Sequence, residues 1–194
     1  MNMANRPLDT SLFDRAAIFA VNAHAGTERR GKGFPYIIHP MEAAEIVSTI
    51  TSDQELLAAA MLHDTVEDTD VTLEQIRDEF GDRIAALVAS ESDTFNDWES
   101  EEESWHRRKQ EAMDRISASP RDSKIVALGD KLSNMRAIAR DYAVMGDDLW
   151  NIFHVKAKQE HEWHYRGLAD SLRDLQDTDA FHEFERLINQ VFGI

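Results

Sequence analysis

The sequence contains no cysteine. Disulfides, thiolate nucleophiles and cysteine-rich zinc sites are therefore excluded, and the composition fits a reducing compartment. No apolar run approaches the roughly 20 residues that a membrane-spanning helix needs. The first residues also lack the apolar core of a signal peptide. We therefore expect a cytoplasmic protein with no membrane partner.

Positive charge is also scarce. The chain has 21 lysines and arginines against 37 acidic residues, which gives a formal net charge of −16. Such a field repels nucleic acid, so nucleic acid is not an expected partner. A small phosphate-bearing ligand would need a local basic patch or a bound metal ion, and short basic clusters do occur at 29–32 and 105–109. Protein partners and oligomeric state cannot be predicted from these properties.

The pattern of apolar residues predicts an all-α fold. At 194 residues, the chain is long enough for one domain with a substantial core. Apolar residues recur at helical spacing, and no segment alternates with a period of two. We expect a single compact helical bundle over 1–194, with its main motifs in about 10–140 and helices near 148–175 and 178–192 completing it.

Several helix starts carry capping signals. Ser52 with Glu55 and Thr72 with Gln75 each have the spacing of a capping box. The pair His39-Pro40 places a proline at the first position of another helix. These signals predict helix starts near residues 40, 53 and 73.

A histidine and three carboxylates cluster after the apolar run that ends at Leu62. His63 and Asp64 are followed by Glu67 and Asp68, about one helical turn further on. Crowded carboxylates at the edge of a buried surface raise one another's pKa, so the cluster is costly without a cation. The alternative is an ordinary solvated, acidic helix end.

Two further polar residues stand beside dense apolar sequence. His39 precedes one predicted helix, and Asp130 follows Gly129 inside another. A glycine in a helix interior costs about 1 kcal/mol relative to alanine, which predicts close packing against the backbone there. Imidazole and carboxylate ligands together suit manganese, iron or zinc. Spacing alone does not separate such ligands from structural histidines.

Four motifs resemble the HD hydrolase domain of the RelA/SpoT family. They are AHAG at 23–26, PYIIHP at 35–40, AAMLHDTVEDT at 59–69 and DKLSNMR at 130–136. They follow the family's order over about residues 10–140. The later WHYR at 163–166 is similar to a segment of the single-domain members, and no synthetase-like segment follows. The chain is thereby identified as resembling a small alarmone hydrolase.

The resemblance implies a metal centre with catalytic carboxylates beside it. Glu67 and Asp68 would handle the attacking water. The implied substrate is a guanosine nucleotide with a pyrophosphate on its 3′ oxygen, and hydrolysis would release that pyrophosphate. One Mn²⁺ would be held by four residues: His39, His63, Asp64 and Asp130.

The implied substrate contacts are Asn134, near the metal, and Arg30, against the base. Lys32 is a further candidate because a lysine can meet phosphates as a point charge. The chain departs from the family here, since glycine separates Arg30 from Lys32 and Ala137 stands where a hydroxyl-bearing residue is common. The adenosine alarmone (p)ppApp is therefore an open alternative to (p)ppGpp.

Two other functions also stay open. One is hydrolysis of another phosphate ester, such as NADPH or a deoxynucleotide, by the same centre. The other is nucleotide sensing without catalysis, which the intact Glu67-Asp68 pair argues against. His24 is expected to brace the loop, Trp105 to anchor a solvated basic face at 107–109, and His161 to serve in packing. For Tyr165 and Arg166 two roles stay open, closing the pocket and ordinary helix packing.

Overall fold

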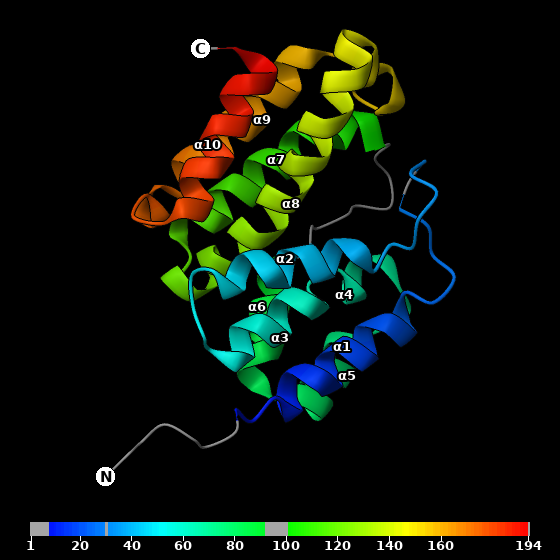
Figure 1. Ribbon diagram of the computed structural model, residues 1–194, viewed down its shortest axis with the longest axis vertical. Helices are drawn as coiled ribbons and strands as arrows, with labels where there is room; N and C mark the ends of the chain where they lie inside the picture. Colours follow the sequence, from blue (N-terminus) through cyan, green and yellow to red (C-terminus); the bar gives the residue numbers. More distant parts are fainter. Residues whose placement is uncertain (1–7, 30, 92–100, 194) are drawn as a thin grey trace.

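The computed structural model describes residues 8–29, 31–91 and 101–193. Within these ranges the chain is helical and forms no strand, which confirms the all-α prediction (Figure 1). An isolated bridge joins Glu28 to Pro35 in the loop before the second helix. None of the described helices is long and apolar enough to cross a membrane.

The helices gather into two groups that meet along α8 (Figure 1). The first group contains α1 (Ser11–Ala23), α2 (Ile38–Ser48), α3 (Gln54–Leu62), α4 (Thr65–Asp68), α5 (Leu73–Phe80) and α6 (Asp82–Glu91). The second contains α7 (Glu101–Ala118), α8 (Arg121–Met145), η1 (Gly146–Ile152), α9 (Lys158–Ser171), η2 (Arg173–Leu175) and α10 (Asp179–Phe192).

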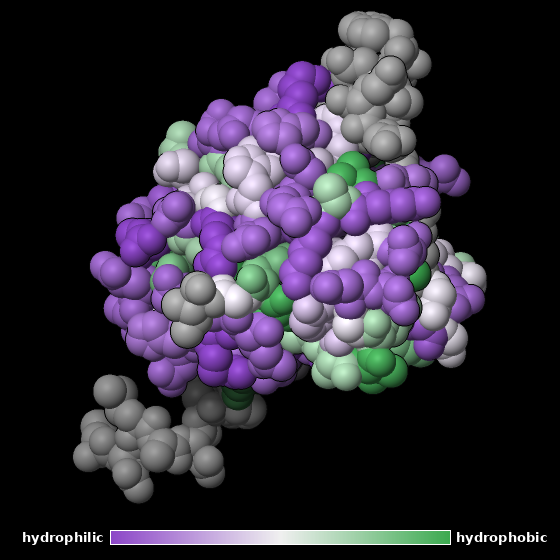
Figure 2. All heavy atoms as spheres, turned by 90° about the horizontal axis from the view of Figure 1, so that it is seen from above, coloured by the Kyte–Doolittle hydropathy of each residue, from purple (hydrophilic) through white to green (hydrophobic). Residues whose placement is uncertain are grey.

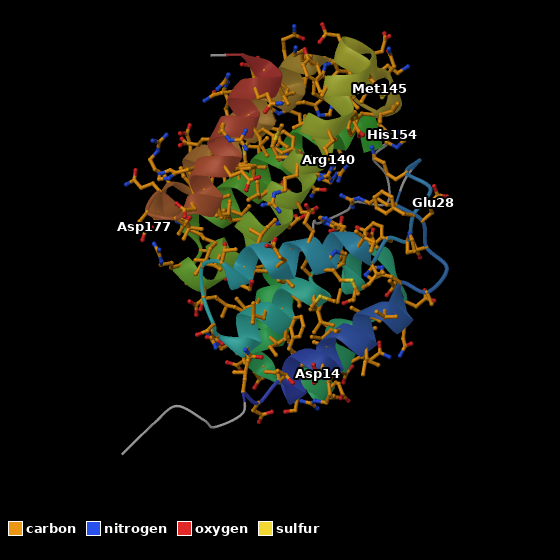
Figure 3. All side chains as sticks on the ribbon, in the orientation of Figure 1. Asp14, Glu28, Arg140, Met145, His154 and Asp177 are labelled. Atoms are coloured by element: carbon orange, nitrogen blue, oxygen red, sulfur yellow. The ribbon has the colours of Figure 1, made fainter. Side chains whose placement is uncertain are left out.

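The long helix α8 is the central element of the packing. It contacts α2 and α3 in the first group and α10 in the second. A continuous cluster of buried apolar side chains includes Ala16 of α1 and Val191 of α10. The face seen in Figure 2 carries mainly hydrophilic side chains. Glu28 in the loop and Asp177 before α10 are also exposed (Figure 3).

The helix starts agree with the capping signals to within two residues. The capping box of Thr72 and Gln75 is present as predicted. At α3 the prediction was wrong by one position, because the side chain of Asp53 accepts the hydrogen bond from the Glu55 backbone amide. Helix α2 begins at Ile38, so His39 lies in its first turn rather than at its N-cap.

The prediction of a single long helix over 148–175 was wrong. The chain forms η1, leaves helical structure after Ile152 and re-enters it in α9. The rings of Trp150 and His161 stack at 5.0 Å. Eleven residues of continuous helix would separate them by roughly 16 Å, so this contact requires a break between them. The polar sequence at 90–96 predicts a loop, followed by a helix from about residue 98. Most of these positions lie outside the described residues, and α6 continues to Glu91.

The glycine inside α8 allows two helices to come close together. A Cβ on Gly129 would lie 2.8 Å from the backbone oxygen of Ala43 and 2.8 Å from Cγ2 of Val47, both in α2. This confirms the predicted close packing. The approach places the first turn of α2 beside the residue that follows Gly129.

We expect Gly129→Ala to destabilise the protein by about 1–3 kcal/mol, because the α2 backbone cannot move away without repacking. Gly167→Ala is the matched control within α9, since its Cβ would meet the end of the flexible Met113 side chain. Urea unfolding of both variants measures the difference. Equal stabilities would contradict the packing argument.

Candidate metal centre and substrate cavity

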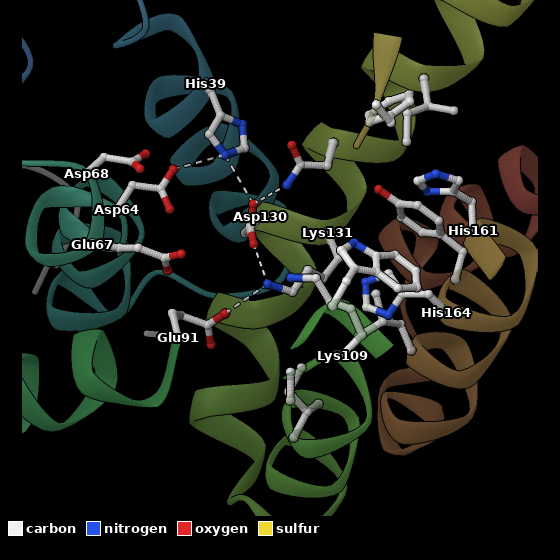
Figure 4. A pocket seen from close by; sticks show the side chains of 18 of the residues that line it. His39, Asp64, Glu67, Asp68, Glu91, Lys109, Asp130, Lys131, His161 and His164 are labelled. Atoms are coloured by element: carbon white, nitrogen blue, oxygen red, sulfur yellow. Dashed lines mark hydrogen bonds and ion pairs between the residues drawn. The ribbon is translucent and has the colours of Figure 1, made fainter. Parts of the chain in front are cut away.

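The four predicted metal ligands lie together where α2, the α3–α4 junction and α8 meet. Three of them, His39, Asp64 and Asp130, are seen in Figure 4. Nε2 of His39 is 3.3 Å from Oδ2 of Asp64 and 3.1 Å from Oδ1 of Asp130. Nε2 of His63 is 3.1 Å from the same Asp64 oxygen and 3.6 Å from the same Asp130 oxygen. Residues far apart in the sequence thus present two nitrogen and two oxygen atoms to one point.

Hydrogen bonds on the far side of each imidazole fix its orientation. Nδ1 of His63 lies 2.8 Å from the Ala60 carbonyl, which can only accept, so this nitrogen carries the proton. Nδ1 of His39 lies 2.8 Å from Oγ of Ser133, whose hydroxyl donates to Glu42 at 2.7 Å. His39 is therefore the donor to Ser133. When a metal ion is bound, each ring would therefore be neutral and would present the lone pair of its Nε2 beside the carboxylates.

A lone pair that faces a carboxylate oxygen at about 3 Å needs a positive charge between them. At His63 a proton on Nε2 supplies this charge when no metal ion is bound, and a divalent ion can replace that proton and serve both histidines at once. The ligand atoms of His39, His63 and Asp130 lie within 4.8 Å of one another, and all three residues are buried. Imidazole and carboxylate donors in this arrangement suit a divalent metal ion.

The carboxylates dominate the electrostatics of the cluster. Burial disfavours the charged form of His63, but Asp64 and Asp130 outweigh it and raise the pKa of His63 well above its ordinary value. The pKa of Asp64 is held well below its usual range because His63 and His39 outweigh the effect of burial. Lys131 and the two histidines likewise outweigh burial and hold the pKa of Asp130 well below its usual range.

Tyr36 supports the cluster from the loop before α2. Its hydroxyl donates a hydrogen bond of 2.6 Å to Oδ2 of Asp64. Burial and the negative charge of Asp64 raise the pKa of Tyr36, so it remains a donor at neutral pH. The ring also packs against His24, 4.9 Å between centroids, which places His24 behind the cluster as a bracing residue.

Glu67 and Asp68 lie in α4, one turn beyond the cluster. Their side chains are directed to the same space as Asp64 (Figure 4), and both line a cavity of about 470 Å³. The two residues are exposed, in contrast to the buried histidines. Carboxylates in this position can accept a proton from a water molecule beside the cluster.

The opposite wall of this cavity is basic and aromatic. It carries Lys109 and Arg115 of α7 with an aromatic group around Trp105 and Tyr165, whereas Lys131 of α8 also lines the cavity but reaches Asp130 at the cluster itself. The prediction of a solvated basic face at 107–109 is wrong for Lys109, which lines the cavity, and for Arg108, which is buried. One signal was available, since the α7 residues at 105, 109, 112 and 116 share a helix face.

His161 and His164 of α9 also belong to this wall. Nε2 of His161 lies 2.7 Å from the Val155 carbonyl oxygen. Because a carbonyl can only accept, Nε2 carries the proton and donates it to this hydrogen bond. Burial lowers the pKa of both histidines, so neutral rings form this part of the wall. The packing role expected for His161 is compatible with this position, and the wall position itself was not predicted.

A second cavity of about 280 Å³ adjoins the first and shares Arg29 and His39 with it. Lys32 lines this second cavity, where its ammonium pairs with Asp141 of α8. Arg29 donates a hydrogen bond to Oδ1 of Asn134. Nδ2 of Asn134 in turn donates to Oδ1 of Asp130 at 2.5 Å.

The predicted substrate residues therefore separate into three cases. Asn134 lies in the first cavity beside a predicted metal ligand, and Lys32 lies in the second cavity. Arg30 lies outside the described residues, and its neighbour Arg29 is the arginine that borders both cavities. The sequence analysis did not select Arg29, because the family pattern was matched at Arg30.

Comparisons with known proteins agree with this geometry. A family model described as an HD domain matches residues 16–155. A guanosine-3′,5′-bis(diphosphate) 3′-pyrophosphohydrolase of Aquifex aeolicus is 34% identical over 138 residues, which cover 70% of this chain and 19% of that protein. The chain thus spans about a fifth of the length of such long relatives.

Shorter relatives match over nearly their whole length. The guanosine-3′,5′-bis(diphosphate) 3′-pyrophosphohydrolase MESH1 of Mus musculus is 37% identical over 180 residues, 91% of this chain and 90% of that protein. The solved structure of a metazoan orthologue of SpoT that hydrolyses ppGpp superposes with a TM-score of 0.73, covering 98% of this chain and all of the other. Sequence identity in that superposition is 21%, so it shows a shared fold.

The raised pKa of His63 predicts how metal binding depends on pH. Near neutral pH this imidazole is protonated, so a metal ion must displace about one proton to bind it. Metal affinity should rise with pH up to the pKa of His63 and then level off. Asp64 and Asp130, whose pKa values are lowered, are ionised throughout this range.

Calorimetric titration of Mn²⁺ in buffers of different ionisation enthalpy measures the released proton. His63→Gln should bind the metal weakly and without this proton release, while the exposed His182→Gln should match the wild type. Metal binding by the wild type without proton release near neutral pH would contradict the assignment.

Proposed function

Because this chain belongs to the HD domain family, we propose that it is a metal-dependent hydrolase of alarmone nucleotides that carry a 3′-pyrophosphate. The match over residues 16–155 and the similarity to MESH1 over nearly its whole length establish the family. They confirm the resemblance predicted from the four motifs. The observation that carries the proposal is one cavity with a buried His-His-Asp cluster at one wall and a basic opposite wall.

We assign the metal site to the four clustered residues His39, His63, Asp64 and Asp130. The mixed nitrogen and oxygen donors support one Mn²⁺ as the native ion. Such an ion supplies charge neutralisation at the phosphoryl oxygen and lowers the pKa of a bound water. Ser133 and Ala60 hold the two imidazoles in the orientation that this requires.

Glu67 and Asp68 handle the attacking water, and one of them accepts its proton. The oxygen of the water bonds to the phosphorus next to the 3′ oxygen, and the bond from that phosphorus to the 3′ oxygen breaks. The 3′ oxygen then takes up a proton. The products are pyrophosphate and GDP or GTP, or the corresponding adenosine nucleotides.

The two adjoining cavities support one orientation of the substrate. The phosphate groups fit the larger cavity, whose wall includes Lys109, Arg115 and Lys131. The nucleoside fits the smaller cavity, which is lined partly by Phe34 and Ala137. We assign substrate contacts to Asn134, Arg29 and Lys32, and retain Arg30 as a candidate from the sequence.

Adenine and guanine remain alternative bases in this proposal. Ala137 lines the smaller cavity at the position where the sequence departs from the family pattern, so no hydroxyl is offered to the base there. Hydrolysis of another ester such as NADPH is the second candidate function, because the same centre could polarise its 2′-phosphate. Nucleotide sensing without catalysis is the third. A cytoplasmic location stays a prediction from the composition.

Incubation of the Mn²⁺-loaded protein with ppGpp, ppApp and NADPH tests the proposal directly. We expect stoichiometric pyrophosphate from at least one alarmone, because in the proposed orientation the ligand cluster and the carboxylates of Glu67 and Asp68 would lie beside the scissile bond. Asp64→Ala should abolish turnover and weaken metal binding. Consumption of NADPH alone would replace the proposal with the second candidate, and alarmone binding without products would favour sensing.

Glu67→Gln separates water activation from metal binding. Removal of a general base lowers kcat by about 10²–10⁴-fold, and we expect a decrease in this range at saturating Mn²⁺. Metal content should stay equal to that of the wild type, because Glu67 lies outside the ligand cluster. Glu74→Gln, at an exposed position of α5, is the matched control and should retain full activity. Loss of metal from Glu67→Gln would contradict the assigned role.

A further inference from the structure

Lys131 joins the ligand cluster to a buried carboxylate that the proposed mechanism does not use. Its ammonium lies 2.5 Å from Oδ2 of Asp130 and 3.5 Å from Oε2 of Glu91, the last residue of α6 (Figure 4). Asp130 uses its other oxygen, Oδ1, toward the histidines. All three residues line the larger cavity.

The contact between Asp130 and Lys131 is unusual for neighbours on a helix. Side chains at positions i and i+1 point about 100° apart and do not face each other. Lys131 must therefore bend back along α8 to reach Asp130. Glu91 lies on the facing helix α6 and contacts the bent lysine, so the position of the ammonium is set from two helices.

Of the two partners in the ion pair between Lys131 and Glu91, the lysine is the more exposed. The side chain of Glu91 is 4% exposed, whereas that of Lys131 is 20% exposed. Burial raises the pKa of Glu91, although the positive charge of Lys131 opposes the shift. The carboxylate thus stands behind the lysine, and the ammonium lies on the cavity side.

A second buried lysine on α8 shows the opposite arrangement. Lys124 pairs with Asp174 at 2.5 Å, and here the lysine side chain is 6% exposed while the carboxylate is 67% exposed. That pair connects α8 to η2 at the protein surface, away from either of the two adjoining cavities. An ion pair that only fastens helices therefore does not require the lysine to face a cavity.

We propose that Lys131 is a substrate-binding residue for the pyrophosphate group and that Glu91 is the positioning residue that holds it. This inference rests on the proposed function. In phosphoryl transfer the transferred group bears charge on its equatorial oxygens, and a fixed ammonium beside them neutralises it. Lys131 lines the same cavity as Lys109, Arg115 and the ligand Asp130, and the pyrophosphate group would sit in that cavity.

The test compares Lys131→Met, Lys131→Arg and the matched control Lys124→Met. Calorimetry measures the binding of inorganic pyrophosphate to each Mn²⁺-loaded protein, and kinetics at saturating Mn²⁺ give kcat and KM. Because a hydrogen bond to a charged group is lost, Lys131→Met should weaken pyrophosphate binding by about tenfold or more. Lys131→Arg should retain most of the binding, and Lys124→Met should bind as the wild type does.

The positioning role of Glu91 is tested by a double-mutant cycle. Glu91→Gln should weaken pyrophosphate binding in the wild type but have no further effect in Lys131→Met, because its influence passes through the lysine. Glu91→Gln should also restore part of the thermal stability lost in Lys131→Met, since it removes an unpaired buried charge.

Unchanged pyrophosphate binding in Lys131→Met, or no binding by the wild type, would overturn the inference. A lowered melting temperature with unchanged binding would assign the pair a structural role alone. Failure of the proposed function is distinguishable, because it appears as a lack of alarmone turnover in the wild type. Pyrophosphate binding still decides the role of Lys131 in that case.

Discussion

The structure depends on two imidazole Nε2 atoms that face carboxylate oxygens at one buried point. Such an arrangement is unfavourable unless a positive charge lies between the nitrogen and oxygen atoms. Three separate segments supply the four side chains, so a cation at this point also links α2, the α3–α4 junction and α8. Gly129 permits the approach of α2 to α8 that brings His39 within reach of Asp130.

Hydrogen bonds outside the cluster hold one of its histidines in orientation. His39 donates to Ser133, and Ser133 donates to Glu42. Arg136 contacts Glu42 at 3.4 Å and forms two hydrogen bonds with Glu183 of α10. A continuous polar chain thus connects one imidazole to the last helix. The C-terminal helices therefore support the orientation of a ligand that lies in the first half of the chain.

The sequence predicts the parts of the site that are local in the chain. His63, Asp64, Glu67 and Asp68 lie within two helical turns, and their motif identified the family. Contacts between distant segments were less accessible. The wall formed by Lys109 and the aromatic residues requires α7 and α9 to face the metal centre, which composition and periodicity do not specify. The break before α9 follows from the packing of Trp150 on His161, a contact that no local pattern encodes.

The charge distribution explains how so acidic a chain can accept a polyphosphate. The net charge of −16 would repel such a ligand from most of the surface. Inside the larger cavity, however, acidic groups occupy the side toward α4, and Lys109 and Arg115 occupy the other. A divalent cation at the ligand cluster would offset the acidic side, so the phosphate groups would meet positive charge from both directions. Metal binding and substrate binding are therefore electrostatically coupled, because the acidic wall can face a phosphate only after the cation has neutralised it.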